Sequence, residues 1–309
     1  MAPALVLAIY YWSFVLSPVP LASDRPIGSA ARVGQRAMED PPRGRGTAGQ
    51  VADLGLDTEL AARATDLYQR GRYGEAVEAL RDLLQRSPND HLAIGRLARA
   101  YGHLGRHRDE AVQWERYLLL APRTEEACPA LPRAYEAIGE TAKAFEAFER
   151  CRSLDSTDSD IVFYYARARE RAGDAKRAIQ LYEEGISLAP DYADMYLGLA
   201  RLRLRGGDVD GASEAVGRAM RHDSRSADVL LAAGQIAARQ GRRKDARDYL
   251  LRALAVGETY VDVHLTLARV ELEDGRRDQA VTHCDRALQL APGSAEALAL
   301  KRRLDEARR

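Results

Sequence analysis

Histidine and cysteine residues near the C-terminus are the first place in this sequence where chemistry could reside. His264, His283 and Cys284 carry imidazole and thiol groups, which bind metal ions and transfer protons. In the repeat described below, however, His264 and Cys284 fall on positions that pack against neighbouring helices. We therefore expect all three to be core or surface residues.

A second histidine pair and a search for known catalytic motifs also give no indication of a catalytic site. His103 and His107 are four residues apart, but Gly105 lies between them and predicts a helix end, so they should not share a helix face. The sequence holds no GxSxG, HExxH or GxxxxGK motif, and none of its cysteines has CxxC spacing. We predict a non-enzymatic protein with no catalytic residue, no metal site and no cofactor.

The charge composition limits the kinds of partner. The chain has 46 Lys and Arg residues and 46 Asp and Glu residues, so its formal net charge is zero. Broad nucleic-acid binding requires a net basic surface. We therefore expect a protein or peptide partner and no nucleic acid.

Residues 1–23 differ from the rest because they contain no charged side chain. Their continuous apolar part, Ala4 to Leu16, is shorter than the about 20 residues of a membrane-spanning helix and fits a secretory signal. Several Arg residues follow it, which favours retention of the following chain in the cytoplasm. We predict a signal peptide or membrane anchor at 1–23, and a flexible linker at 24–56, where hydrophobic periodicity is absent.

Three alternatives for the location stay open. The folded part is exported (periplasmic or extracellular) or anchored on the outer side, or it is anchored on the cytoplasmic face. The third alternative is a chain that starts at Met38. In the anchored cases the N-terminal segment contacts a membrane.

Glycine recurs with a period of 34 residues through most of the chain. A glycine at the end of a helix adopts a left-handed conformation without a steric penalty, so each one predicts a turn between two helices. Alanine follows five residues later in six of the seven cases, as expected where two helices approach closely; Glu110 takes that place in the second. The seven glycines are Gly71, Gly105, Gly139, Gly173, Gly207, Gly241 and Gly275.

This pattern resembles the tetratricopeptide repeat, a helix–turn–helix unit of 34 residues. The resemblance is carried in one unit by Tyr196, Leu199, Ala200, Gly207, Ala212 and Ala219. It implies an all-α fold, a right-handed superhelical solenoid, because one hairpin cannot bury its apolar face alone. Seven units at 57–90, 91–124, 125–158, 159–192, 193–226, 227–260 and 261–294 and a capping helix at 295–309 account for the chain after the linker.

The third unit departs from the pattern. Pro129 and Pro132 fall within its first helix, where a proline removes a hydrogen bond and costs about 3 kcal/mol. We therefore expect this helix to be shortened to about 129–138. In the same unit Cys128 and Cys151 fall on opposing positions of the hairpin, so a disulfide is possible in an exported protein and two buried thiols are the alternative.

One row of arginines is the most informative pattern. The ninth position of the repeat points into the concave groove in this family, and here it holds Arg in five of seven units, with Thr65 and Gln235 in the others. The fifth position also faces the groove and is apolar in the later units. The predicted partner-binding residues are therefore Arg99, Arg133, Arg167, Arg201, Arg269, Phe163, Leu197, Leu231 and Leu265.

Two interpretations of the arginine row remain open. Acids also recur every 34 residues near the start of the first helices, at Asp160, Asp194, Asp228 and Asp262, and they could neutralise the row as scaffold. Alternatively, the row binds carboxylates of a partner while the apolar row anchors its hydrophobic side chains.

Three function classes follow. The first is a non-catalytic scaffold that binds an acidic and apolar partner segment; similar exported or anchored bacterial repeat proteins serve as assembly factors for envelope complexes or cytochrome c. The second is a self-assembling structural protein. The third is an enzyme whose site lies between helices or needs a partner chain.

Overall fold

The repeating unit of the structure is a pair of antiparallel α-helices. The computed structural model describes residues 48–121, 124–257 and 260–306, and no strand occurs in these ranges. The helices are α1 (Ala48–Gln69), α2 (Tyr73–Arg86), α3 (His91–His103), α4 (His107–Leu120), α5 (Thr124–Ala137), α6 (Thr141–Leu154), α7 (Ser159–Arg171), α8 (Ala175–Leu188), α9 (Ala193–Arg205), α10 (Val209–His222), α11 (Ala227–Arg239), α12 (Arg243–Val256), α13 (Val261–Glu273), α14 (Arg277–Leu290) and α15 (Ala295–Glu306).

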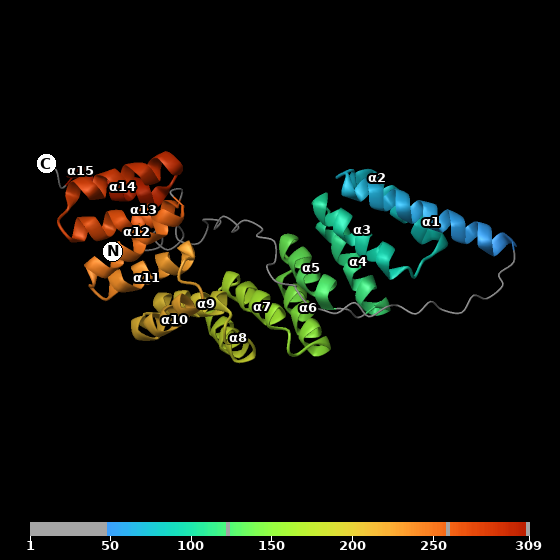
Figure 1. The fold of residues 1–309 in the computed structure, drawn as a ribbon, viewed down its shortest axis with the longest axis horizontal. Helices are drawn as coiled ribbons and strands as arrows, with labels where there is room; N and C mark the ends of the chain where they lie inside the picture. The colour runs from blue at the N-terminus through green and yellow to red at the C-terminus, as the bar shows by residue number, and fades with distance from the viewer. Residues whose placement is uncertain (1–47, 122–123, 258–259, 307–309) are drawn as a thin grey trace, which may run out of the picture. The chain divides into compact units, whose positions relative to one another are not determined.

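From α2 to α15, each helix packs on the next helix along the chain. In addition, α3 contacts α5, α5 contacts α7, α9 contacts α11 and α11 contacts α13 (Figure 1). The odd-numbered helices are the first helices of the repeats. They therefore form a layer on which side chains from neighbouring repeats meet.

The glycines predicted from the 34-residue period form the turns inside the hairpins. All seven have a positive φ, between 69° and 84°. After Gly173, the backbone N–H of Asp174 donates to the carbonyl of Arg169 at 2.9 Å, which closes the helix end in the manner of a Schellman motif. The same arrangement recurs at the other six turns, so the predicted helix-ending role is confirmed.

The alanine five residues after each glycine is a contact point between helices. Ala178, Ala212 and Ala246 are each 0% exposed. In the second hairpin Glu110 takes this place, and a Cβ at Gly102 would lie 2.9 Å from its Oε1 atom. Glycine at position 102 therefore provides the room that the larger side chain needs.

The C-terminal helix α15 packs against α14. Ala297, Leu300 and Leu304 are buried there in a cluster with Cys284. On the outer side, Lys301 Nζ donates to Asp285 Oδ1 at 2.7 Å. An apolar inner face and a charged outer face are what the end of a repeat array requires.

Two sequence-based expectations about helix boundaries are wrong. Helix α1 begins at Ala48, so the last residues of the predicted 24–56 linker are helical. Helix α5 runs unbroken from Thr124 through Pro129 and Pro132 instead of being shortened to 129–138. The face of α5 that holds Ala127, Leu131 and Ala134 is buried against its neighbours, and this burial offsets the hydrogen bonds that the two prolines remove.

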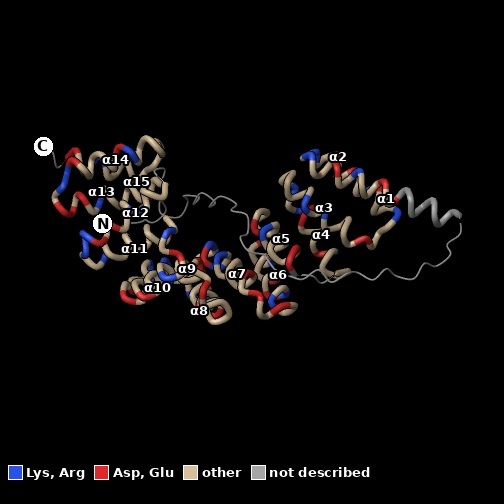
Figure 2. The backbone as a smooth tube through the Cα atoms, in the orientation of Figure 1, with Lys and Arg blue, Asp and Glu red and all other residues tan. Residues whose placement is uncertain are grey.

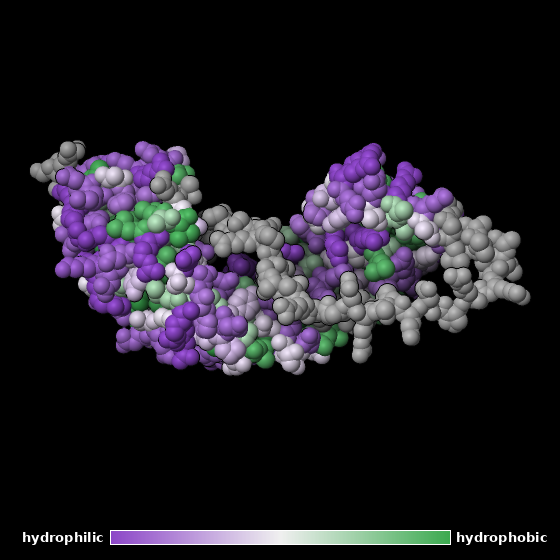
Figure 3. Space-filling model, viewed as in Figure 1, coloured by the Kyte–Doolittle hydropathy of each residue, from purple (hydrophilic) through white to green (hydrophobic). Residues whose placement is uncertain are grey.

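The surface of the repeats is mainly hydrophilic. In the space-filling view purple covers most of the visible face of the described residues, and hydrophobic surface is limited to separate patches (Figure 3). Basic and acidic residues alternate along the helices without a long segment of one sign (Figure 2). The charge balance seen in the composition therefore also holds locally, and a binding site must be sought in specific side chains.

Candidate functional site

His264, His283 and Cys284, the side chains most suited to chemistry, are not arranged as a catalytic site. His264 is buried, and its Nδ1 lies 3.1 Å from Nδ1 of His283. Burial lowers the pKa of His283, and His264 lowers it further. Cys284 is fully buried, its Sγ donates to the carbonyl of Ala297 at 3.4 Å, and burial raises the pKa of its thiol. A protonated, enclosed thiol is a poor nucleophile.

The other histidine pair is separated by a turn, as predicted. His103 ends α3 and His107 begins α4. His103 Nε2 lies 3.0 Å from the hydroxyl of Tyr68, and His107 Nδ1 lies 2.9 Å from Glu110 Oε2. Among the residues that the structure describes, no group of three or more His, Cys, Asp and Glu side chains is placed to hold a metal ion.

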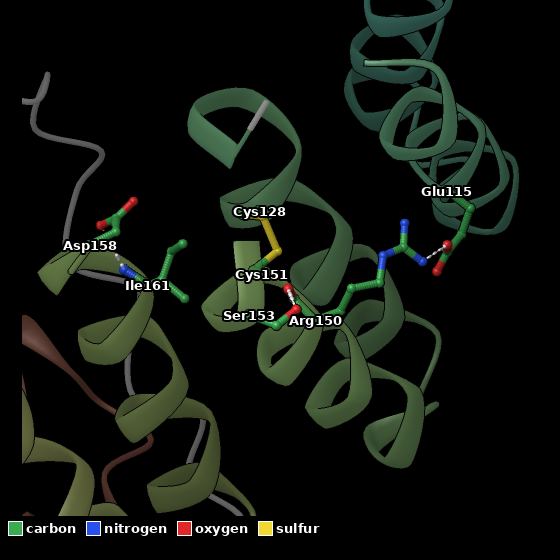
Figure 4. Close-up of a disulfide and its surroundings, with 7 residues drawn as sticks. All are labelled: Glu115, Cys128, Arg150, Cys151, Ser153, Asp158 and Ile161. Atoms are coloured by element: carbon green, nitrogen blue, oxygen red, sulfur yellow. Dashed lines mark hydrogen bonds and ion pairs between the residues drawn. A yellow bond between two sulfur atoms is a disulfide. The ribbon is translucent and has the colours of Figure 1, made fainter. Parts of the chain in front are cut away.

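A disulfide joins the two helices of the third hairpin. Cys128 on α5 and Cys151 on α6 are bonded, with their Cα atoms 5.6 Å apart (Figure 4). Directly before Cys151 on α6, Arg150 Nη1 donates to Glu115 Oε2 of α4 at 2.5 Å. The proline-containing helix is therefore tied covalently to α6, and α6 is tied electrostatically to the preceding hairpin.

At its two ends, the ninth-position arginine row is neutralised. Arg99 Nη2 lies 2.6 Å from Glu126 Oε2, and Arg269 pairs in the same way with Glu296. Each glutamate is the second residue of the following unit. At these two ends the interpretation of the row as scaffold holds.

The middle of the row is different. In the described part of the chain no ion pair is formed by Arg133, Arg167 or Arg201. The acids that follow them in the equivalent second position are aspartates, whose carboxylate lies one methylene closer to the backbone than that of glutamate. Three guanidinium groups on neighbouring first helices therefore keep their charge without a direct partner.

The aspartates are nonetheless close to the row. Desolvation raises the pKa of the Asp194 carboxyl, while the charges of Arg201 and Arg167 lower it. Asp160 accepts a hydrogen bond from the hydroxyl of Tyr192, and burial together with this carboxylate raises the pKa of Tyr192. Asp194 is therefore close enough to Arg167 and Arg201 to reduce their positive field, although among the described residues it forms no ion pair with either.

A pocket that the sequence did not predict lies further along the first helices. It has a volume of about 290 Å³ and is formed by α9, α11 and α13. Its polar lining combines thirteenth-position and ninth-position residues of successive units with the sixth-position Thr266, and its apolar lining comes from Leu204, Ala238 and Val270. The polar residues are Arg205, Gln235, Arg239, Thr266, Arg269 and Glu273.

Comparison with known proteins agrees with the geometry. Two family models described as tetratricopeptide repeat match the sequence, one at residues 170–236 and 237–304 and the other at 61–132, together more than half of the chain. The chain is a tetratricopeptide repeat protein. The predicted right-handed solenoid of helical hairpins is therefore confirmed, and the family is one of protein-interaction scaffolds.

Solved structures show the same fold. A tetratricopeptide repeat protein from Parabacteroides merdae is 13% identical, with a TM-score of 0.61, over 79% of this chain and 96% of its own. PilF from Pseudomonas aeruginosa is 20% identical, with a TM-score of 0.59, over 69% of this chain and 97% of its own. The C-terminal part of a repeat protein from Cytophaga hutchinsonii is 17% identical, with a TM-score of 0.59, over 77% and 98%. No curated protein matches the sequence.

The apolar row predicted beside the arginines serves the tetratricopeptide core. Phe163, Leu197 and Leu265 are only 8%, 3% and 3% exposed, while Leu231 is half-buried. The ring of Phe163 is covered by Tyr192, with 5.1 Å between centroids. Three of the four residues predicted as an apolar row facing the groove are therefore buried, and Tyr192, which directly precedes α9, covers the first of them.

The N-terminal predictions concern a different part of the chain. The proposed signal or anchor at 1–23 and the linker up to residue 47 lie outside the described residues. None of the described helices combines the length and apolar character that crossing a bilayer requires.

Proposed function

We propose that this tetratricopeptide repeat protein is a non-catalytic scaffold that binds an acidic segment of a partner protein on the layer formed by its first helices. The observation that carries the proposal is the set of three ninth-position arginines without ion pairs, Arg133, Arg167 and Arg201. Guanidinium groups match carboxylates in shape as well as charge, since each offers two parallel N–H donors.

The arrangement favours an extended or helical segment over a small molecule. The three arginines come from α5, α7 and α9, so a ligand that reaches all of them must cross successive repeats. The guanidinium of Arg167 lies 5.7 Å from the centre of the Phe163 ring, which leaves a flat cationic surface for a partner side chain. Tyr164 on the same helix is half-buried and adds an aromatic contact.

We also propose that the repeats function outside the cytoplasm. The apolar segment at 1–23 and the Cys128–Cys151 disulfide support this location, because disulfides persist in oxidising compartments. An exported scaffold of this kind suits a role as an assembly factor, for example for an envelope complex or a cytochrome c.

The experiment is a comparative capture from native cells with the full chain as bait. One variant carries Arg133→Gln, Arg167→Gln and Arg201→Gln. The matched control carries Arg99→Gln, which removes an arginine of the same row that is already paired and lies outside the pocket formed by α9, α11 and α13. We expect a partner that is recovered with wild type and control and reduced at least tenfold with the triple variant. Equal recovery of the same proteins by all three baits would overturn the proposal.

A further inference from the structure

A ladder of ion pairs runs along the first helices. Arg171 Nη2 donates to both carboxylate oxygens of Glu136, each at 2.7 Å. One repeat later Arg205 Nη2 donates to Oε1 of Glu170, whose Oε2 accepts from the hydroxyl of Tyr182. In both cases the arginine is the thirteenth residue of its unit and the glutamate is the twelfth residue of the preceding unit.

The ladder stops at the next repeat. Arg239 is the thirteenth residue of its unit, but the twelfth residue of the preceding unit is Leu204. Arg239 has no ion pair within the described ranges, and Leu204 is half-buried. The chain thus repeats the arginine of the ladder and omits its carboxylate at this one rung.

The position at which this carboxylate is missing lies in the pocket formed by α9, α11 and α13. Arg239 lines the pocket together with Leu204 and the two arginines on either side, Arg205 and Arg269. Glu273, the one acid in the lining, has its Oε2 atom 3.8 Å from Nε of Arg243, which begins the preceding helix α12.

The pocket is also positive in its local field. Desolvation lowers the pKa of Arg269, and the neighbouring charges of Arg239 and Arg303 lower it further. The amide of Gln235 and the hydroxyl of Thr266 add neutral polar groups, and that hydroxyl donates to the Asp262 carbonyl at 2.7 Å. Because Arg205 and Arg269 are already paired with Glu170 and Glu296, Arg239 is the lining arginine whose charge is left for an anion that enters this space.

We propose that this pocket binds one oxyanion of the bound segment, which takes the place of the carboxylate that Leu204 omits from the ladder. Two groups share the required chemistry: the carboxylate of an Asp or Glu side chain and the phosphoryl group of a modified side chain. The Arg239 guanidinium donates to the oxyanion, and Leu204 and Val270 contact the methylenes that carry it. The inference rests on the proposed function and names the place where its acidic segment is held.

Small anions test the pocket without knowledge of the partner. Succinate and inorganic phosphate are titrated separately into the full chain, and the arginine Nε–Hε signals are followed by NMR. We expect a saturable shift of the Arg239 signal with one of the two anions. Tighter binding of succinate points to a carboxylate ligand, and tighter binding of phosphate points to a phosphoryl ligand.

Three variants locate the effect. Arg239→Gln removes the proposed donor, and Leu204→Glu completes the ladder so that an internal carboxylate fills the site. We expect each to weaken anion binding at least tenfold. Arg171→Gln is the matched control, since it removes the arginine of an intact rung, and should change the affinity less than twofold. Circular dichroism checks that each variant folds; if Leu204→Glu does not fold, the comparison of Arg239→Gln with Arg171→Gln still decides.

Two results would overturn the inference: the absence of a saturable shift in the wild type, or equal loss in Arg239→Gln and Arg171→Gln. These outcomes are independent of the capture experiment above. If anion binding is absent but capture still depends on Arg133, Arg167 and Arg201, the scaffold proposal stands and the pocket assignment fails. If the anion binds but capture does not depend on those arginines, the pocket assignment stands and the proposed role of the three arginines fails.

Discussion

The two ends of the arginine row and its middle have the same residue at the same position of the repeat, yet their electrostatic environments differ. At the ends, Arg99 and Arg269 are paired with Glu126 and Glu296. In the middle, the following unit supplies an aspartate instead, and the arginine stays unpaired. The length of the neighbouring acid, which differs by one methylene, therefore accompanies the difference between an ion-paired arginine and an unpaired one.

The comparison also shows why a repeat should not be treated as uniform. The residues that recur in every repeat determine the helical hairpin. The residues between them differ, and they determine which charged and polar side chains each repeat exposes. The ladder at the thirteenth position behaves in the same way, because its carboxylate is present at Glu136 and Glu170 and absent at Leu204. We therefore expect partner binding at the positions where a repeat departs from its neighbours.

The largest expected effect concerns the third hairpin, where the middle of the row begins with Arg133. Reduction of Cys128–Cys151, which closes a loop between residues 23 apart in sequence, should destabilise α5 and α6 by about 3 kcal/mol. Hydrogen exchange should then accelerate about 100-fold in these two helices and much less in α13 and α14. The control is a Cys128→Ala, Cys151→Ala variant, which should not respond to reductant. Free thiols at both Cys128 and Cys151 in non-reducing mass spectrometry of the native protein would contradict the premise.

A smaller effect distinguishes the two kinds of glycine that support the middle of the row. A Cβ at Gly198 would lie 2.3 Å from Cζ of Tyr182, whereas a Cβ at Gly173 would meet nothing within 4 Å. Gly198→Ala should therefore cost about 2 kcal/mol through overpacking, and Gly173→Ala about 1 kcal/mol through its positive φ alone. Urea unfolding followed by circular dichroism measures both. A larger loss for Gly173→Ala would contradict the close packing of Tyr182 against Gly198 of α9.

A third prediction concerns exchange of the acids between the two regions. Glu126→Asp should release Arg99 and lower stability by about 0.5 kcal/mol, because the pair is partly exposed. The measurement is the chemical shift of the Arg99 Nε–Hε group together with thermal unfolding. An unchanged arginine signal would mean that the length of the acid does not decide the pairing.

The smallest expected effect is pH dependence at the C-terminal end. The pKa of His283 is lowered from its ordinary value of 6.5, so the unfolded state binds a proton more readily than the folded state. Its contribution to stability is therefore complete above about pH 6.5 and is lost as the pH falls through the lowered pKa. We expect acid to weaken hydrogen-exchange protection of α13 and α14 more in the wild type than in His283→Asn. An identical pH response of the two proteins would refute this role of His283.

Much of the fold could be predicted because its signals are local. A glycine with positive φ and a small alanine act within their own hairpin, so Gly173 and Ala178 carry the same information in the sequence and in the structure. The errors arose where distant contacts decide. The burial of Leu131 keeps α5 helical despite Pro129 and Pro132, and the ring of Tyr192 covers Phe163.

The sequence could predict which residues belong to the candidate site, but not which of them form ion pairs. The repeat number places Arg167 and Arg201 in one row, but whether Asp194 reaches them depends on side-chain length and on the spacing of α7 and α9. The pocket required the further knowledge that a thirteenth residue meets the twelfth residue of the preceding unit. Given that rule, the missing acid at Leu204 can be read from the sequence.

The central claim is that the unpaired arginines in the middle of the row bind the partner. It is tested most directly by lengthening the neighbouring acids with Asp160→Glu, Asp194→Glu and Asp228→Glu and measuring affinity for the captured partner. Each substitution adds one methylene and leaves every arginine in place. We predict that the arginine signals shift on pairing, that the fold is retained and that affinity falls at least tenfold. Unchanged affinity after the arginines have become paired would contradict the proposal that they bind the partner.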